Sequence, residues 1–194
     1  MARVAIITGA TGGLGMEFIR VIDNWDDIDE IWAVGRNEDK LSNLSYSYKK
    51  VIAISVDLLK NGMEILSEKV MLEKPEIRLL INNAGVLLTD SIESIKLDDW
   101  NTTFATNTTS TMLMTKHFID ILLETKGCIL NNASIDGLQS CNRGRASYAY
   151  ASSKAAVIHF TQLCALNYAN KGVRINCICP GVTETPFFTN IYKN

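Results

Sequence analysis

The chain has 194 residues, and its 47% hydrophobic content supplies enough apolar material for one well-buried domain. The formal net charge is −2 and no long block of one sign occurs, which argues against a nucleic-acid or membrane-surface role. The apolar run Val4-Ala5-Ile6-Ile7 is too short for a signal-peptide core, and no run approaches the roughly 18 apolar residues of a spanning helix.

Short apolar runs alternate along the chain with longer stretches of helical character. Strands are predicted at six runs, Val4–Thr8, Ile31–Gly35, Val51–Val56, Leu79–Asn82, Cys128–Asn132 and Arg174–Cys179. Helices are predicted near Gly13–Ile22, from Asp98 to about Glu124 with Asp98 as N-cap, and over Ser147–Asn170. The strands are continuous apolar runs, which is typical of burial on both faces. The pattern predicts one α/β domain with a Rossmann-like, doubly wound parallel sheet flanked by helices.

A glycine-rich turn, Thr8-Gly9-Ala10-Thr11-Gly12-Gly13-Leu14-Gly15, follows the first predicted strand and opens the first helix. In a doubly wound sheet this turn binds a pyrophosphate, because glycines allow close backbone approach and the helix N-terminus favours an anion. A tight packed turn without a ligand is the alternative. The position between strand and helix favours the nucleotide site.

The end of the second predicted strand bears on the choice of nucleotide. An acidic residue about 20 residues after the glycine turn would hold the ribose 2′-hydroxyl of NAD. Here the sequence Ala33-Val34-Gly35-Arg36-Asn37 places Arg36 at that point, and no carboxylate occurs until Glu38. Arginine suits a 2′-phosphate, so the sequence favours NADP(H) over NAD(H). A surface arginine without a ligand is the alternative.

Tyr150 and Lys154 lie four residues apart inside the last predicted helix. Residues at i and i+4 share a helix face, so both groups can point into one site, although the same spacing also occurs on solvated faces. A nearby positive charge would lower the pKa of a tyrosine from about 10 and permit proton transfer near neutral pH. The two histidines, His117 and His159, fall within long helical stretches and have no paired catalytic context.

Five cysteines give an odd count, and their spacing is not that of a zinc site. A reduced protein fits this pattern best, because disulfide frameworks are typical of small secreted domains. We therefore expect a cytoplasmic location and no metal site.

From residue 1 to about residue 188 the chain resembles the classical short-chain dehydrogenase/reductase family. The resemblance rests on ordered motifs, which are the glycine turn, Asp57-Leu58, Asn82-Asn83-Ala84-Gly85, Asn107, Ser134, Tyr150 with Lys154, and Pro180-Gly181-Val182-Thr183-Glu184-Thr185. The glycine turn also fits the extended, epimerase-type members. The motif at 82–85, the Pro180-Gly181 pair and the short length favour the classical group.

The resemblance implies a cofactor site and a catalytic set. The cofactor would contact Thr8, Gly9, Gly13, Leu14, Gly15, Arg36, Asp57, Leu58, Asn83, Ala84, Gly85, Tyr150, Lys154, Pro180, Gly181, Thr183 and Thr185. Tyr150 would exchange a proton with the substrate oxygen, which Ser134 would orient. Lys154 would lower the pKa of Tyr150 and contact the nicotinamide ribose, and Asn107 would hold a water linking Lys154 to solvent. The implied reaction is hydride transfer between NADP(H) and a small-molecule carbonyl or alcohol.

Two features depart from the family pattern. The family usually shows Asn-x-Ser-Ser where this chain has Asn131-Asn132-Ala133-Ser134, and Ser134 precedes Tyr150 by 16 positions, a few more than is commonest. Classical members also continue for several tens of residues past Pro180-Gly181, whereas this sequence ends at Asn194. We therefore expect the domain over residues 1–194 to lack the C-terminal lid and last strand.

Two other functions stay open. A nucleotide-binding regulator with little turnover, or an inactive subunit of a mixed oligomer, would account for the departures, while the presence of all four catalytic residues favours an enzyme. The resemblance also implies a homodimer or homotetramer through the helices at about 98–124 and 147–170. Ala155, Ala156, Phe160 and Leu163 could form that interface or pack on the sheet.

Overall fold

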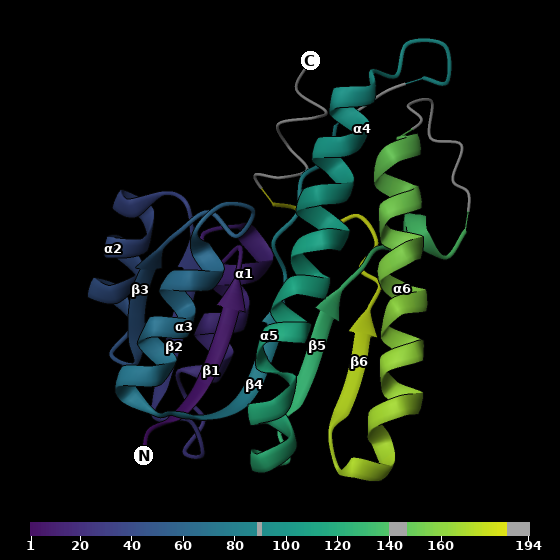
Figure 1. Cartoon of the computed structure of the whole chain (residues 1–194). Helices are drawn as coiled ribbons and strands as arrows, with labels where there is room; N and C mark the ends of the chain where they lie inside the picture. Colours follow the sequence, from purple (N-terminus) through teal and green to yellow (C-terminus); the bar gives the residue numbers. More distant parts are fainter. Residues whose placement is uncertain (89–90, 140–146, 186–194) are drawn as a thin grey trace.

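Six strands form the central sheet of the computed structural model, which describes residues 1–88, 91–139 and 147–185 (Figure 1). They are β1 (Arg3–Thr8), β2 (Glu30–Gly35), β3 (Val51–Ser55), β4 (Glu76–Asn82), β5 (Cys128–Asn132) and β6 (Arg174–Ile178). Their spatial order is β3-β2-β1-β4-β5-β6, and the pairings between neighbours are parallel. This order confirms the predicted doubly wound sheet, whose topological switch point lies between β1 and β4.

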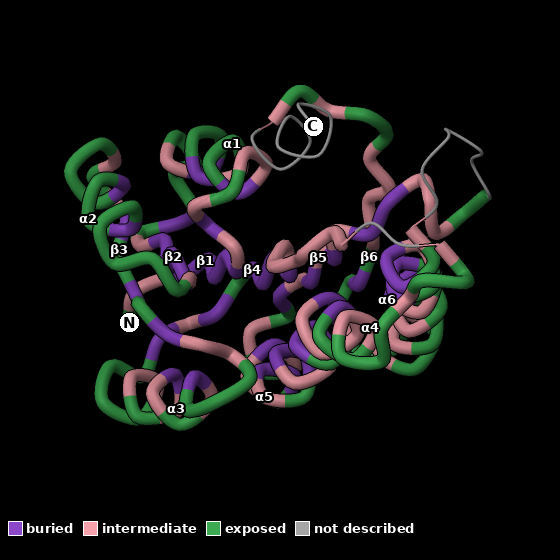
Figure 2. Tube along the Cα trace, turned by 90° about the horizontal axis from the view of Figure 1, so that it is seen from above, coloured by how far each residue is buried: buried purple, intermediate pink, exposed green. Residues whose placement is uncertain are grey.

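Helices cover both faces of the sheet, as the view from above shows (Figure 2). One face carries α1 (Gly13–Ile22) and α2 (Glu38–Ser47), and the other carries α3 (Gly62–Glu73), α5 (Ser110–Thr125) and α6 (Tyr148–Tyr168). Helices α2 and α3 were not among the predicted elements, because each buries few apolar side chains and so lacks a clear apolar stripe. Of the helices that the structure describes, none has the length and apolar content needed to cross a membrane.

The helix predicted from Asp98 to about Glu124 is continuous but contains a wide turn. It begins as α4 (Leu97–Phe104), passes through a π-helical turn at Ala105–Thr109 and continues as α5. The prediction of Asp98 as N-cap is wrong, because the N-cap is Lys96 and Asp98 lies in the first turn. A carboxylate there still interacts favourably with the helix dipole. Such π turns are often found at functional sites.

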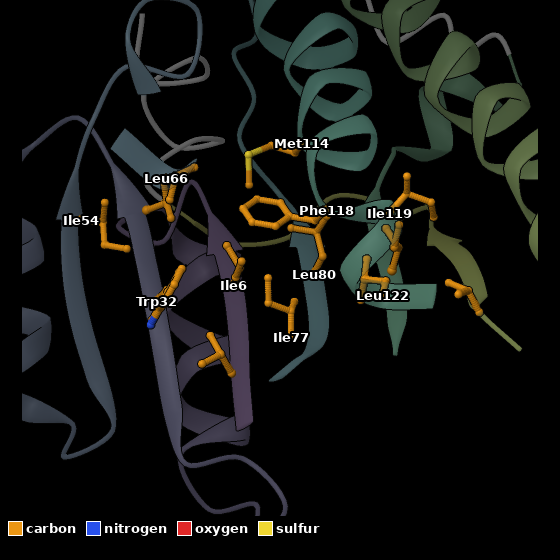
Figure 3. Close-up of a cluster of buried hydrophobic side chains, with 14 of the residues drawn as sticks. Ile6, Trp32, Ile54, Leu66, Ile77, Leu80, Met114, Phe118, Ile119 and Leu122 are labelled. Carbon is orange, nitrogen blue, oxygen red and sulfur yellow. The ribbon is translucent and has the colours of Figure 1, made fainter. Parts of the chain in front are cut away.

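Apolar side chains fill the space on both sides of the sheet. Ile6 and Phe118 belong to the cluster between the sheet and the α3–α5 layer (Figure 3). Ile7 and Ile19 belong to the cluster on the α1–α2 side. Neighbouring residues of β1 therefore enter different clusters, which explains its continuous apolar run. Burial on both faces is confirmed for β1 and β2, whereas β3 at the end of the sheet exposes Ile52.

The outer side of α6 keeps part of its apolar surface exposed. Ala155 and Leu163 are exposed, and Ala156 and Phe160 are half-buried. Packing against the sheet therefore accounts for only part of this stripe, and self-association through α6 stays a prediction.

The cysteines that the structure describes are free and half-buried. They are Cys128, Cys164, Cys177 and Cys179, and the fifth, Cys141, lies outside the described residues.

Candidate functional site

The carboxyl ends of the strands open onto a cavity of about 1120 Å³ that spans the topological switch point. Most of the residues predicted for the site line it: Gly9, Gly13, Leu14, Arg36, Asp57, Leu58, Asn83, Ala84, Gly85, Ser134, Tyr150, Lys154, Pro180, Gly181, Thr183 and Thr185. Three others, Thr8, Gly15 and Asn107, are buried behind this lining. Residues from six strand ends and from α6 thus meet in one space.

The glycine turn after β1 packs directly on the segment after β4. Gly9 has a φ of +62°, and a Cβ there would lie 2.8 Å from the Cα of Ala84. A Cβ at Gly15 would lie 2.4 Å from the carbonyl oxygen of Gly9. Only glycine adopts the positive φ at position 9 and leaves room for these backbone contacts at positions 9 and 15 without strain. Helix α1 starts at Gly13 without a side-chain cap, so the amides of its first turn can bind an anion.

Asn83 connects the glycine turn to the end of β5. Its Nδ2 donates to the carbonyl oxygens of Thr8 at 3.1 Å and Gly9 at 3.0 Å, and its Oδ1 accepts from Asn132 Nδ2 at 2.8 Å. The hydroxyl oxygen of Thr8 accepts from the backbone amides of Asn83 at 2.9 Å and Ala84 at 3.0 Å. These bonds fix the relative positions of three strand ends, so the glycine turn and the β5 end form one rigid unit.

Lys154 is a buried cation at the inner side of α6. Its Nζ donates to the carbonyl oxygen of Asn132 at 2.7 Å, which links α6 to the Asn83 network. A Cβ at Gly85 would lie 3.5 Å from this Nζ, so the segment after β4 also reaches Lys154. Burial lowers the pKa of Lys154 to about 8, because the charged form loses its hydration. Lys154 can therefore exchange a proton close to neutral pH.

Tyr150 lies one helical turn before Lys154, and 7% of its surface is exposed. Burial raises the pKa of Tyr150 above its ordinary value, a hydrogen bond with Ser134 lowers it, and the Asp136 carboxylate raises it. The net shift is upward, and the prediction that Lys154 lowers this pKa stays a prediction. The Nζ of Lys154 lies 5.7 Å from the centre of the Tyr150 ring and donates to Asn132 instead. Tyr150 is therefore protonated at neutral pH.

Asn107 occupies the π turn and joins it to two other segments. Its Oδ1 accepts from the Val86 amide at 2.8 Å, and its Nδ2 donates to the Val86 carbonyl at 3.0 Å and to Ser153 Oγ at 2.9 Å. The hydroxyl of Ser153 in turn donates to the carbonyl oxygen of Tyr150 at 2.7 Å. The described bonds give Asn107 an anchoring position beside α6, and its predicted water-holding role stays a prediction.

Asp136 lines the cavity and was not among the residues predicted for the site. It lies in a 3₁₀ turn, Ile135–Gly137, that follows β5, and its amide donates to Ser134 Oγ at 3.2 Å. The available signal was its position two residues after the predicted catalytic serine, at the carboxyl end of a strand. The turn that places Ser134 beside Tyr150 thus also brings a carboxylate into the cavity.

The histidines lie outside the cavity lining. His117 Nε2 is 3.0 Å from Ser67 Oγ between α5 and α3, and burial lowers the pKa of this histidine. His159 is exposed on α6. Within residues 1–88, 91–139 and 147–185, no three His, Cys, Asp or Glu side chains lie close enough to bind a metal ion together.

Comparison with known proteins agrees with this architecture. A family model described as short chain dehydrogenase matches residues 3–194. A meso-2,3-butanediol dehydrogenase of Serratia marcescens is 31% identical, with 94% of this chain and 72% of the relative covered. A 3-oxoacyl-[acyl-carrier-protein] reductase of Chlamydia pneumoniae is 30% identical, with 100% and 79% covered. The solved structure of an actinorhodin polyketide ketoreductase with NADPH has a TM-score of 0.90 at 26% identity, with 99% of this chain and 75% of the other covered.

Proposed function

Because the chain belongs to the short-chain dehydrogenase family, we propose that it transfers a hydride between NADP(H) and a small carbonyl or alcohol substrate. One observation carries the proposal: a tyrosine, a serine and a buried lysine line the same cavity as a glycine turn at a helix N-terminus. The glycine turn suits a dinucleotide, and the three side chains suit proton transfer to an oxygen.

The cavity suits an extended dinucleotide because it runs from the end of β3 to the end of β6. Different parts of its lining would hold different parts of the cofactor. The amides at the start of α1 would hold the diphosphate, and Asp57 and Leu58 would contact the adenine. The segments 83–85 and 180–185, with Lys154 and Tyr150, would hold the nicotinamide and its ribose. Thr8 and Gly15, the two ends of the glycine turn, are buried behind the residues that would contact the diphosphate. The nicotinamide would supply or accept the hydride when bound.

NADP(H) is the proposed form of the cofactor because of Arg36. This exposed residue follows β2 and lines the cavity, so its guanidinium can pair with a 2′-phosphate. The neighbouring Asn37 caps α2 by accepting from the Lys40 amide at 2.9 Å, which fixes the backbone beside Arg36. The structurally similar actinorhodin ketoreductase is described with NADPH.

The proton chemistry follows from the two shifted pKa values. A tyrosine whose pKa is raised carries its proton at pH 7, which suits Tyr150 as the donor to a carbonyl oxygen during reduction. Ser134 would hydrogen-bond to that oxygen and hold it in place. Lys154, with a pKa of about 8, would return a proton to this site, with Asn107 helping to hold a linking water.

Self-association as a homodimer or homotetramer is proposed to use the exposed side of α6.

The substitution Tyr150→Phe tests this mechanism, because it keeps the ring and removes only the hydroxyl. We expect kcat with NADPH and a panel of ketones and aldehydes to fall by about 100-fold or more. The dissociation constant for NADPH, measured by fluorescence, should change little. Tyr168→Phe, the same change at the far end of α6, is the matched control.

Near-normal turnover in Tyr150→Phe would contradict the proposed role. NADPH binding by the wild-type chain with no turnover across the panel would instead favour a nucleotide-binding regulator.

A further inference from the structure

The cavity contains a carboxylate that the proposed hydride transfer does not use. Asp136 is half-buried and lines the cavity beside Ser134 and Tyr150. Within the described part of the chain, Asp136 takes part in none of the ion pairs. A carboxylate in a partly buried site loses hydration, so a partner of opposite charge or a hydrogen-bond donor would stabilise it.

The turn that carries Asp136 is held between α6 and the end of β6. The amide of Ile135 donates to the carbonyl oxygen of Pro180 at 3.0 Å. A Cβ at Gly137 would lie 2.6 Å from the backbone carbon of Lys154, so the turn rests directly on the α6 backbone. The Asp136 amide donates to Ser134 Oγ. The backbone that carries the carboxylate is therefore held in place relative to the residues that would bind the carbonyl oxygen.

Among the described residues, Asp136 brings a negative charge to the part of the cavity beside Tyr150. Within residues 1–88, 91–139 and 147–185, the other charged residues that line the cavity are Arg36, Asp57 and Lys154. Arg36 and Asp57 follow β2 and β3, on the other side of the switch point between β1 and β4. Lys154 is buried and donates to a backbone carbonyl. Burial is the main cause of the raised pKa of Tyr150, and the Asp136 carboxylate contributes to it, so the two groups lie close enough to interact.

We propose that Asp136 is a specificity-determining residue of the carbonyl site. It accepts a hydrogen bond from a hydroxyl or ammonium group on the carbon beside the reacting carbonyl, and it repels a carboxylate at that position. The preferred substrates are then hydroxyketones and aminoketones rather than keto acids. Val86, Leu87 and Val182 also line the cavity and suit an apolar remainder of the substrate. The inference rests on the proposed function and adds its substrate class.

Three ketones that share an acetyl group test this inference, because they differ mainly in the charge of the neighbouring substituent. Aminoacetone, hydroxyacetone and pyruvate would be assayed with NADPH at pH 7 and low salt. We expect kcat/KM to be highest for aminoacetone and lowest for pyruvate in the wild-type chain. Asp136→Asn should reduce the ratio between these two by about tenfold or more, because a unit charge a few ångströms away is removed. Asp120→Asn makes the same change in net charge on exposed α5 and should leave the ratio unchanged.

A binding measurement separates this inference from the proposed reaction. The affinities of the same three ketones would be measured by calorimetry in the Tyr150→Phe chain with NADPH, with and without Asp136→Asn. The same charge order, lost on Asp136→Asn, would support the inference even if no ketone is turned over. A ratio that Asp136→Asn leaves unaltered in either assay would overturn the inference, while turnover that depends on Tyr150 would leave the proposed function intact.

Discussion

The glycine-turn end and the α6 end of the cavity are built in opposite ways. At the glycine turn the structure depends on missing side chains, because a Cβ at Gly9 or Gly15 would collide with backbone atoms. At α6 it depends on ionisable side chains that are buried, and Tyr150 and Lys154 have shifted pKa values for that reason. The first end is therefore sensitive to added volume and the second to changes of charge and pH. Substitutions at each end can separate these two sensitivities.

The largest effect is expected from a single added methyl group at the glycine turn. In Gly15→Ala the Cβ would lie 2.4 Å from the Gly9 carbonyl oxygen, so the turn or α1 must move. We expect the free energy of unfolding to fall by about 3 kcal/mol and NADPH binding to weaken, as measured by urea unfolding and NADPH fluorescence.

Gly181→Ala is the matched control at the α6 end of the cavity. A Cβ there would have no atom of the described residues within 4 Å, so stability should change by less than about 0.5 kcal/mol. Equal losses in both variants would show that added volume does not distinguish the two ends.

Removing the buried charge of Lys154 should instead stabilise the chain in a pH-dependent way. The pKa of Lys154 is about 8 in the folded chain against 10.5 as the ordinary value, so the unfolded chain binds the proton more tightly. Below pH 8 the full cost of the buried charge is present, and the cost falls as pH rises from about 8 to 10.5. Lys154→Met should raise the free energy of unfolding at pH 7 by about 2 kcal/mol, since the loss of the hydrogen bond to Asn132 offsets part of the gain.

Urea unfolding of both chains at pH 7 and pH 10 measures this effect without cofactor. The difference between Lys154→Met and the wild-type chain should shrink at the higher pH. A difference that stays constant between the two pH values would contradict the shifted pKa.

The smallest of these effects is expected at Arg36, which lines the cavity just after β2. Arg36→Asp replaces a cation that would pair with a 2′-phosphate by an anion that would repel it and accept from a 2′-hydroxyl. We expect the ratio of kcat/KM for NADPH to that for NADH to fall by about tenfold or more.

Arg174→Asp makes the same charge change at an exposed position at the start of the edge strand β6, four strands away from β2, and serves as the control. A cofactor preference that responds equally to both substitutions would mean that net charge, and not the position of Arg36, sets the ratio.

The glycine-turn end was easier to predict from sequence than the α6 end. Gly9 and Gly15 are needed for reasons that act over a few residues, so their spacing after an apolar run carries the signal. The direction of the Tyr150 pKa shift depends on burial by distant segments and on where the Lys154 ammonium points, which the i, i+4 spacing does not contain. Asp136 was missed for a similar reason, because its place in the cavity depends on packing of its turn against α6.

The secondary structure, too, was easier to predict where the signal was local in the sequence. Continuous apolar runs predicted all six strands to within a few residues, because a buried parallel strand requires them. Helices α2 and α3 were not identified because their stability comes from a few contacts with the sheet rather than a long apolar stripe. The N-cap at Lys96 in place of Asp98 shows that an acidic residue near a helix start can act through the dipole without capping.

The π turn at Ala105–Thr109 changes the direction in which side chains point before and after it within one helix. A turn with one additional residue rotates everything before it by about 100° relative to everything after it. This rotation lets α4 pack against α6 while α5 packs against β4, although the two helices share one axis. The π turn thus lies between the part of the helix that packs against α6, which carries Tyr150, and the part that packs against the sheet.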